Sequence, residues 1–165
     1  MKRLWLLSFL LVEACSKPTF SFRGFTDLSD CRSVIDSELA DGATFNTAFD
    51  ALMPGGDKDG TVTHLDGKLG TVPIAIFVSC YRNGKVSSVD YIANVADTAA
   101  SSNTFDAFDR ELKAIYGEGR DSFTRESRRK TYVCGEPATV VLREAQLAQA
   151  DYEVSLLVVP HPSDC

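Results

Sequence analysis

The 165-residue sequence has few of the side chains that most often carry chemistry: two histidines, His64 and His161, one tryptophan and two methionines. It contains no HExxH zinc motif, no GxSxG nucleophile motif, no CxxC pair and no glycine-rich phosphate loop. Metal hydrolases, serine hydrolases and nucleotide-binding proteins therefore have no motif support. We expect no cofactor and no catalytic residue set, and we expect both histidines to lie at the surface.

Basic residues are also in deficit, with 17 Lys and Arg against 23 Asp and Glu and a formal net charge of −6. This balance argues against a nucleic-acid partner and against electrostatic docking on anionic lipid. Long apolar runs are scarce as well. The longest one covers residues 4–12 with a single hydroxyl, far short of the ~20 residues that a transmembrane helix needs.

That run has the length of the apolar region of a secretory signal peptide. The basic residues Lys2 and Arg3 precede it, and the small residue Ala14 follows it. A positive start, an apolar middle and a small residue at the cleavage position together predict a signal peptide over residues 1–14. The chain is therefore expected to be exported.

The boundary after the run resembles the lipobox of bacterial lipoproteins. Val12 supplies the aliphatic position, Ala14 the small position and Cys15 the lipid-attachment position, whereas Glu13 departs from the usual small or neutral residue. The resemblance implies that Cys15 carries fatty acyl chains and anchors the protein in a membrane. Because Ser16 is not Asp, it also implies the periplasmic side of the outer membrane. Ordinary cleavage after Ala14, giving a soluble periplasmic protein, stays open as the alternative.

The five cysteines form an odd set, which in an exported protein leaves one thiol to explain. Lipidation of Cys15 leaves four cysteines, enough for two disulfides in an oxidising compartment. We favour the pairs Cys31–Cys80 and Cys134–Cys165, because the first two lie on expected core faces and the last would fasten the chain end. The four expected disulfide cysteines are therefore Cys31, Cys80, Cys134 and Cys165.

Residues 15–22 read as a lipidated cysteine and tether, and residues 23–165 as one globular domain. Apolar residues at helical spacing predict helices over 27–39, 44–53 and 104–116. Strand patterns cover 72–81, 86–95, 130–134, 138–143 and 152–159. This order predicts an α+β domain that is stapled by disulfides, with helices packed on one face of an antiparallel sheet in a helix–strands–helix–strands order.

The clearest expected element is a hairpin around Asn83-Gly84, a pair typical of a two-residue type I′ turn. Such a turn pairs Cys80 with Ser87 and Val78 with Val89. The alternation then places one apolar face toward the helices. That expected core face consists of Ile74, Ile76, Val78, Cys80, Val89, Tyr91 and Ala93.

One basic cluster stands out in this acidic chain: Arg125, Arg128, Arg129 and Lys130. Four cations within six residues form a candidate binding surface for an acidic partner, a phosphate or lipid headgroups. The alternative reading is a solvated loop that precedes a strand. The sequence alone leaves both readings open.

An acidic segment gives a weak match to a calcium loop. Asp57, Asp59 and Asp66 fall at positions 3, 5 and 12 of an EF-hand pattern. Gly55 at position 1 has no ligand, and Asp replaces the longer Glu at position 12. The segment therefore reads either as an ordinary acidic turn or as a calcium site. The same three carboxylates are the candidates if the protein is a hydrolase.

The stretch Tyr132-Val133-Cys134 resembles the opening motif of the lipoprotein inhibitors of C-type lysozyme. Their second motif, a Ser-Gly pair before a basic residue and Tyr, is absent here. The resemblance implies a class of function: an inhibitor or immunity protein on the envelope. Our main hypothesis is a non-enzymatic, lipid-anchored binding protein with a protein partner, either such an inhibitor or an envelope-maintenance factor. A periplasmic hydrolase and a calcium-binding envelope protein are the alternatives.

Overall fold

The computed structural model describes residues 30–48, 60–124, 127–133, 138–147 and 151–160. The expected signal peptide, the lipidation site Cys15 and the tether lie outside these residues. Within the described ranges, no helix is long and apolar enough to cross a membrane.

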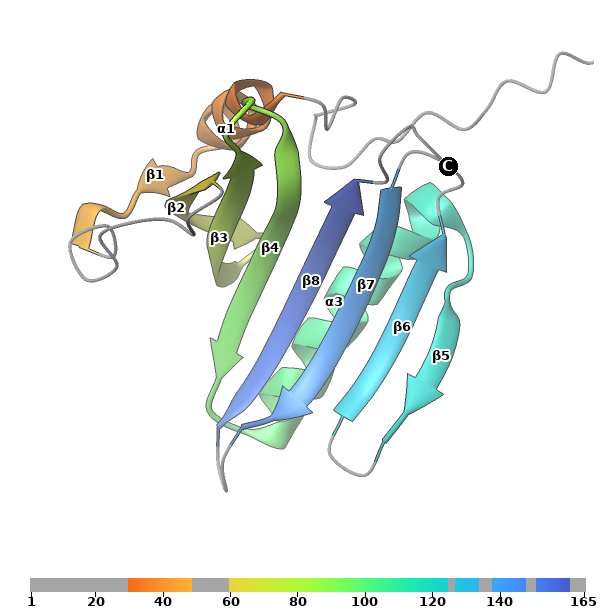
Figure 1. The fold of residues 1–165 in the computed structure, drawn as a ribbon. Helices are drawn as coiled ribbons and strands as arrows, with labels where there is room; N and C mark the ends of the chain where they lie inside the picture. The colour runs from red at the N-terminus through yellow and green to blue at the C-terminus, as the bar shows by residue number, and fades with distance from the viewer. Residues whose placement is uncertain (1–29, 49–59, 125–126, 134–137, 148–150, 161–165) are drawn as a thin grey trace, which may run out of the picture.

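One eight-stranded antiparallel sheet forms the body of the molecule (Figure 1). The strand order is β1-β2-β3-β4-β8-β7-β6-β5, so β4 and β8 join two four-stranded halves. The strands are β1 (Thr44–Phe45), β2 (Gly60–Leu69), β3 (Val72–Tyr81), β4 (Val86–Val95), β5 (Arg120–Phe123), β6 (Ser127–Val133), β7 (Ala138–Gln146) and β8 (Tyr152–Pro160).

The described helices are α1 (Cys31–Ala40) and α3 (Thr98–Tyr116). Helix α3 lies along one face of the sheet and contacts β4, β6, β7 and β8, whereas α1 contacts β3 (Figure 1). Between the helices and the sheet lies a core in which Tyr91, Phe105 and Tyr132 are the largest buried side chains. The opposite face of the sheet carries neither described helix.

The expected fold class is wrong. Among the described residues, strands make up 55% and helices only 28%. The molecule is a single continuous sheet, and the helices do not alternate with strands as packed layers in the expected helix–strands–helix–strands arrangement. The strands listed from the sequence do not include β1, β2 or β5, and residues 44–45, expected in a helix, form β1.

The error in β2 has a local cause. Its sequence carries His64, Asp66 and Lys68 at alternate positions and begins at Gly60, the end of a glycine- and aspartate-rich stretch that reads as a turn. Pairing with β3 along ten residues overrides this local reading. His64 is not a surface residue as expected: it is 5% exposed, and its ring stacks on Phe77 with the centroids 4.5 Å apart.

The β3–β4 hairpin confirms the expected core face but not the expected turn. Tyr81 N–H donates to Lys85 O at 2.8 Å, and Gly84 has φ +79°, so the loop has three residues and ends in a left-handed glycine. Cys80 therefore pairs with Val86 rather than Ser87. A bulge then restores the expected register, and all seven residues of the face are buried: Ile74, Ile76, Val78, Cys80, Val89, Tyr91 and Ala93.

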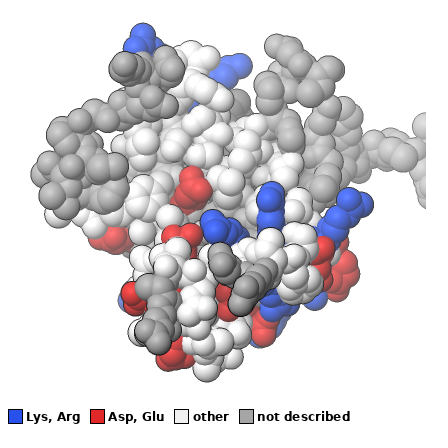
Figure 2. Space-filling view, turned by 60° about the horizontal axis from the view of Figure 1, so that its bottom comes forward, with Lys and Arg blue, Asp and Glu red and all other residues white. Residues whose placement is uncertain are grey.

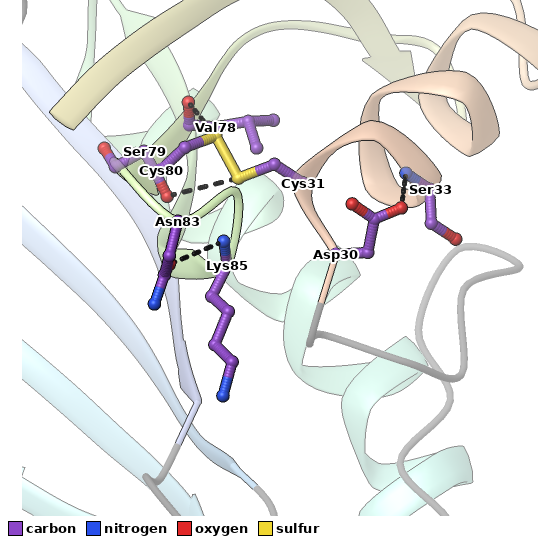
Figure 3. The surroundings of a disulfide bond; sticks show 8 residues. All are labelled: Asp30, Cys31, Ser33, Val78, Ser79, Cys80, Asn83 and Lys85. Atoms are coloured by element: carbon purple, nitrogen blue, oxygen red, sulfur yellow. Dashed lines mark hydrogen bonds between the residues drawn. A yellow bond between two sulfur atoms is a disulfide. The ribbon is translucent and has the colours of Figure 1, made fainter.

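Helix α1 is fastened to this hairpin at its first residue. Cys31 forms the expected disulfide with Cys80 (Figure 3), and Cys31 N–H donates to Gly84 O at 2.9 Å. Asp30 caps the helix by accepting a hydrogen bond from Ser33 N–H at 3.1 Å. Covalent and backbone bonds thus place the start of α1 over the end of β3. Cys134 and Cys165, the other expected pair, lie outside the described residues.

Helix α3 starts at Thr98 rather than at the expected residue 104. Asp97 is its N-cap and accepts a hydrogen bond from Ala100 N–H. Phe105, Phe108 and Leu112, which recur at helical spacing, are buried, whereas Ile115 is 46% exposed. The helix ends at Tyr116, and its C-cap is Gly117 with φ +77°, a conformation that favours glycine.

The helix expected over 44–53 does not begin at Thr44. Thr44 and Phe45 instead pair with β2 as β1, and Phe45 is 54% exposed. Thr47 and Ala48 are helical as expected, and residues 49–53 lie outside the described part of the chain.

Candidate functional site

The face of the sheet opposite α3 gathers polar side chains over five strands, β4, β8, β7, β6 and β5. Alternation sends every second residue of each strand to this face, here called the open face. The register fixes one row across all five strands: Ile92, Ser155, Arg143, Arg129 and Ser122. Neighbouring strands lie about 4.8 Å apart, so this row is a compact surface rather than a scattered set.

The centre of this row is a pair of arginines. Arg129 on β6 pairs directly with Arg143 on β7, and both residues are exposed to solvent. Like charges at facing positions repel each other and destabilise a sheet. In the part of the chain that the structure describes, the ion pairs involve other residues, and neither arginine takes part in one. Two forked guanidinium groups side by side form a surface suited to a carboxylate or phosphate.

Two carboxylates flank the same row on the β4–β8 side. Asp90 lies two residues before Ile92 on β4, and Glu153 lies two residues before Ser155 on β8. Because the two strands are antiparallel, the carboxylates lie on opposite sides of the row. Burial raises the pKa of the Asp90 carboxyl; a hydrogen bond from Ser88 Oγ at 3.1 Å offsets part of this rise, and repulsion by Glu153 adds to it. The open face therefore carries a basic half on β6 and β7 and an acidic half on β4 and β8.

Between the charges the surface is hollowed to a volume of about 520 Å³. Its lining combines Asp90, Glu153, Arg129 and Arg143 with half-buried apolar side chains and hydroxyls. Figure 2 shows basic and acidic side chains close together near the middle of the view. The remaining lining residues are Ile92, Val141, Leu157, Ser122, Thr124, Ser127 and Ser155.

The basic cluster singled out in the sequence is divided between the two faces of the sheet. Arg128, Arg129 and Lys130 lie in strand β6, so alternation sends only Arg129 to the open face. On the helix side, the Arg128 guanidinium lies 4.1 Å from the centre of the Phe105 ring and 3.4 Å from Asp106 Oδ1. Arg125 lies outside the described residues.

Lys130 belongs to a buried ionic network that holds β6 to α3. Its side chain is 4% exposed, and its Nζ lies 3.0 Å from Asp109 Oδ1. The Tyr132 hydroxyl also donates to Asp109, and Lys113 Nζ lies 3.2 Å from Asp109 Oδ2. Lys130 therefore contributes to the core and is not available to a partner at the surface.

This network shifts the titration of its members. Burial by itself raises the pKa of the Asp109 carboxyl, but the hydrogen bonds from Tyr132, Lys130 and Lys113 outweigh it, and the pKa is lowered. Burial and the bond to Asp109 raise the pKa of the Tyr132 hydroxyl. Asp109 therefore stays ionised and Tyr132 stays protonated at neutral pH.

The acidic candidates for calcium binding or hydrolysis are only partly described. Asp57 and Asp59 lie outside the described residues. Asp66 lies on β2, where its carboxylate accepts a hydrogen bond from Asn46 Nδ2 at 2.9 Å and lies 3.8 Å from His64 Nε2. Within the described ranges, no three His, Cys, Asp or Glu side chains come together in a way that could hold a metal ion.

Three members of the site escaped the sequence reading: Asp90, Arg143 and Glu153. Each is a charged residue in an otherwise mainly apolar or hydroxyl-bearing stretch of its strand. The alternation of apolar and polar residues along each strand could have identified them, since each lies at a position that points away from the core. No local pattern places the three near Arg129, because only the pairing of distant strands does so.

No protein-family model matches the chain, and neither a curated protein nor a solved structure matches it. The geometry of the site therefore carries the functional argument.

Proposed function

We propose that this chain is an exported, lipid-anchored protein of a bacterial cell envelope that binds a protein partner through the open face of its sheet. The observation that carries this proposal is the Arg129–Arg143 pair. Two facing cations without an ion pair among the described residues cost stability to keep. A binding role accounts for this cost, since arginine is among the residues enriched at protein interfaces.

The remainder of the open face supports a protein partner. Its hollow is lined by the exposed Arg129 and Arg143 and by half-buried residues, of which Ile92, Val141 and Leu157 are apolar. Protein interfaces have the same composition, with an apolar centre and a polar rim. An inhibitor, an immunity protein and an envelope-maintenance factor are the concrete forms of this function.

The export half of the proposal rests on residues 1–15, the apolar run followed by the lipobox-like Val12, Ala14 and Cys15. Its test is the intact mass of the mature protein isolated from membranes. We expect an N-terminus at Cys15 that carries a diacylglyceryl group and an additional acyl chain. A mature protein with an unmodified Cys15 would overturn the lipid anchor.

The binding half is tested by site-specific photocrosslinking in cells. Benzoylphenylalanine replaces Ser122, which lines the hollow on β5 and is exposed. The matched control replaces Glu111, an exposed residue of α3 on the other side of the sheet. We expect one envelope protein to crosslink at position 122 and not at position 111. Equal crosslinking at both positions, or none at 122, contradicts a binding role of the open face.

A further inference from the structure

The charges on the open face are arranged in a way that selects one kind of partner. The basic half is formed by Arg129 and Arg143 on β6 and β7, and the acidic half by Asp90 and Glu153 on β4 and β8. Ser155 connects the halves, because it pairs with Arg143 on one side and with Ile92 on the other. Opposite charges thus line the two sides of one hollow.

A purely anionic partner fits this hollow poorly. Nucleic acid or an anionic lipid surface would gain contacts to the two arginines but would also meet Asp90 and Glu153 at the same hollow. Like charges brought together at an interface weaken binding strongly. The net charge of −6 adds long-range repulsion to this local effect.

A purely cationic partner fits equally poorly, because it would be repelled by the guanidinium groups. The complementary surface is one that carries both signs at the spacing of neighbouring strands. Protein surfaces offer such neighbouring charges on adjacent side chains, whereas polyanions and headgroup layers offer one dominant sign.

We infer that the partner is a protein whose contacting segment carries an acidic and a basic side chain next to each other. The carboxylate contacts Arg129 and Arg143, and the cation lies over Ser155 between Asp90 and Glu153. This inference rests on the proposed function and adds the chemistry of the partner to it.

The test is affinity measurement with the protein captured from position 122, after its purification. One variant neutralises the basic half by Arg129→Gln and Arg143→Gln, and a second neutralises the acidic half by Asp90→Asn and Glu153→Gln. The control is Arg110→Gln, an exposed cation of α3 on the other side of the sheet. Thermal unfolding of each variant verifies that it is folded before its affinity is compared.

We expect each neutralised half to weaken binding roughly tenfold or more, since close charge pairs across interfaces couple at that scale. The control should stay within about twofold of the wild type. The direction in which the affinity changes when the acidic half is neutralised decides whether the inference holds. If its neutralisation tightens binding, the partner surface is anionic and the inference is wrong. If neither half matters, the inference also fails, although capture at position 122 still supports the binding face.

A second experiment distinguishes a protein partner from a layer of lipid headgroups. The chain with Cys15→Ser, which has no acylation site, is mixed with phosphatidylglycerol vesicles at physiological salt. We expect no sedimentation with the vesicles. Sedimentation that the Arg129→Gln and Arg143→Gln variant abolishes would assign the arginines to lipid headgroups and would overturn the inference.

Discussion

The Tyr91 hydroxyl donates a 2.6 Å hydrogen bond to Glu38 Oε1, and both side chains are fully buried. Tyr91 lies in the middle of β4 and Glu38 in the last turn of α1. This bond therefore connects the helix to a strand residue 53 positions further along the chain. A buried carboxyl of this kind requires hydrogen-bond partners, because its desolvation is costly. The bond is therefore an anchor of α1 that complements the disulfide at the other end of the helix.

Tyr91→Phe removes the donor and keeps the ring. We expect it to lower the free energy of unfolding by about 1–3 kcal/mol, the range for a buried polar group that loses a hydrogen bond. Urea denaturation followed by circular dichroism measures the change. The control is Tyr81→Phe, since Tyr81 is 54% exposed and should be neutral within about 0.5 kcal/mol. Equal effects of the two variants would contradict an anchoring role of this bond.

The Cys31–Cys80 disulfide closes a loop with a sequence separation of 49. Constraint of the unfolded chain by a loop of this length contributes about 4 kcal/mol in the chain-entropy treatment. We expect the paired variant Cys31→Ala/Cys80→Ala to lose stability on that scale in urea denaturation without reductant. If thiol titration of the native wild type found both cysteines reduced, the bond itself would be disproved.

Asp109→Asn removes the carboxylate that faces Lys130 in the buried network. A buried cation that loses its partner typically costs about 3–5 kcal/mol, and we expect a loss of that order at neutral pH. Asp121→Asn is the matched control, because Asp121 is 44% exposed and lies 4.0 Å from the same amine. It should cost less than about 1 kcal/mol.

The lowered pKa of Asp109 also predicts the pH dependence of this effect. A carboxyl whose folded pKa is depressed contributes stability above its unfolded pKa, about 4, and loses that contribution as the pH falls through the folded pKa. The wild type should therefore lose more stability than the Asp109→Asn variant on acidification below about pH 4. Parallel stability curves for the two proteins would rule out the shift.

Asp90→Asn should have the opposite sign. Because the folded pKa of Asp90 is raised, its ionised form opposes folding above the unfolded pKa, and this cost disappears once both states are protonated at low pH. The variant should be more stable than the wild type at pH 7 by on the order of 0.5 kcal/mol, with the gain vanishing below about pH 4. Thermal unfolding across this pH range, with exposed Asp151→Asn as the control, measures the difference.

Local patterns in the sequence were sufficient for the elements that bury one clean apolar face. The β3–β4 hairpin, the buried stripe of α3 and the Cys31–Cys80 pair all follow from alternation, helical spacing and facing core positions. Prediction failed where polar residues occupy a strand. His64, Asp66 and Lys68 leave β2 without the clear apolar alternation of a strand, and Arg128 and Arg129 made the start of β6 look like a loop.

The candidate site was beyond local reading for a different reason. Asp90 and Glu153 are 63 positions apart in the numbering, and their proximity depends on the pairing of β4 with β8. Arg129 and Arg143 meet only through the register of β6 with β7. Pairing partners and register are tertiary properties, so a single sequence shows the outward charges without showing which of them are neighbours.

The pairing of β4 with β8 has a consequence for how the protein gains activity. It is the one junction between the two halves of the described sheet, and it connects residues as far apart as Val89 and Val158. Contacts of such long sequence separation slow folding, because the loop between them must close first. The hairpins of each half are local structures that can form earlier. Asp90 lies on β4, whereas Glu153, Arg129 and Arg143 lie on strands of the other half. The complete set of charges on the open face therefore exists only once this long-range pairing has formed.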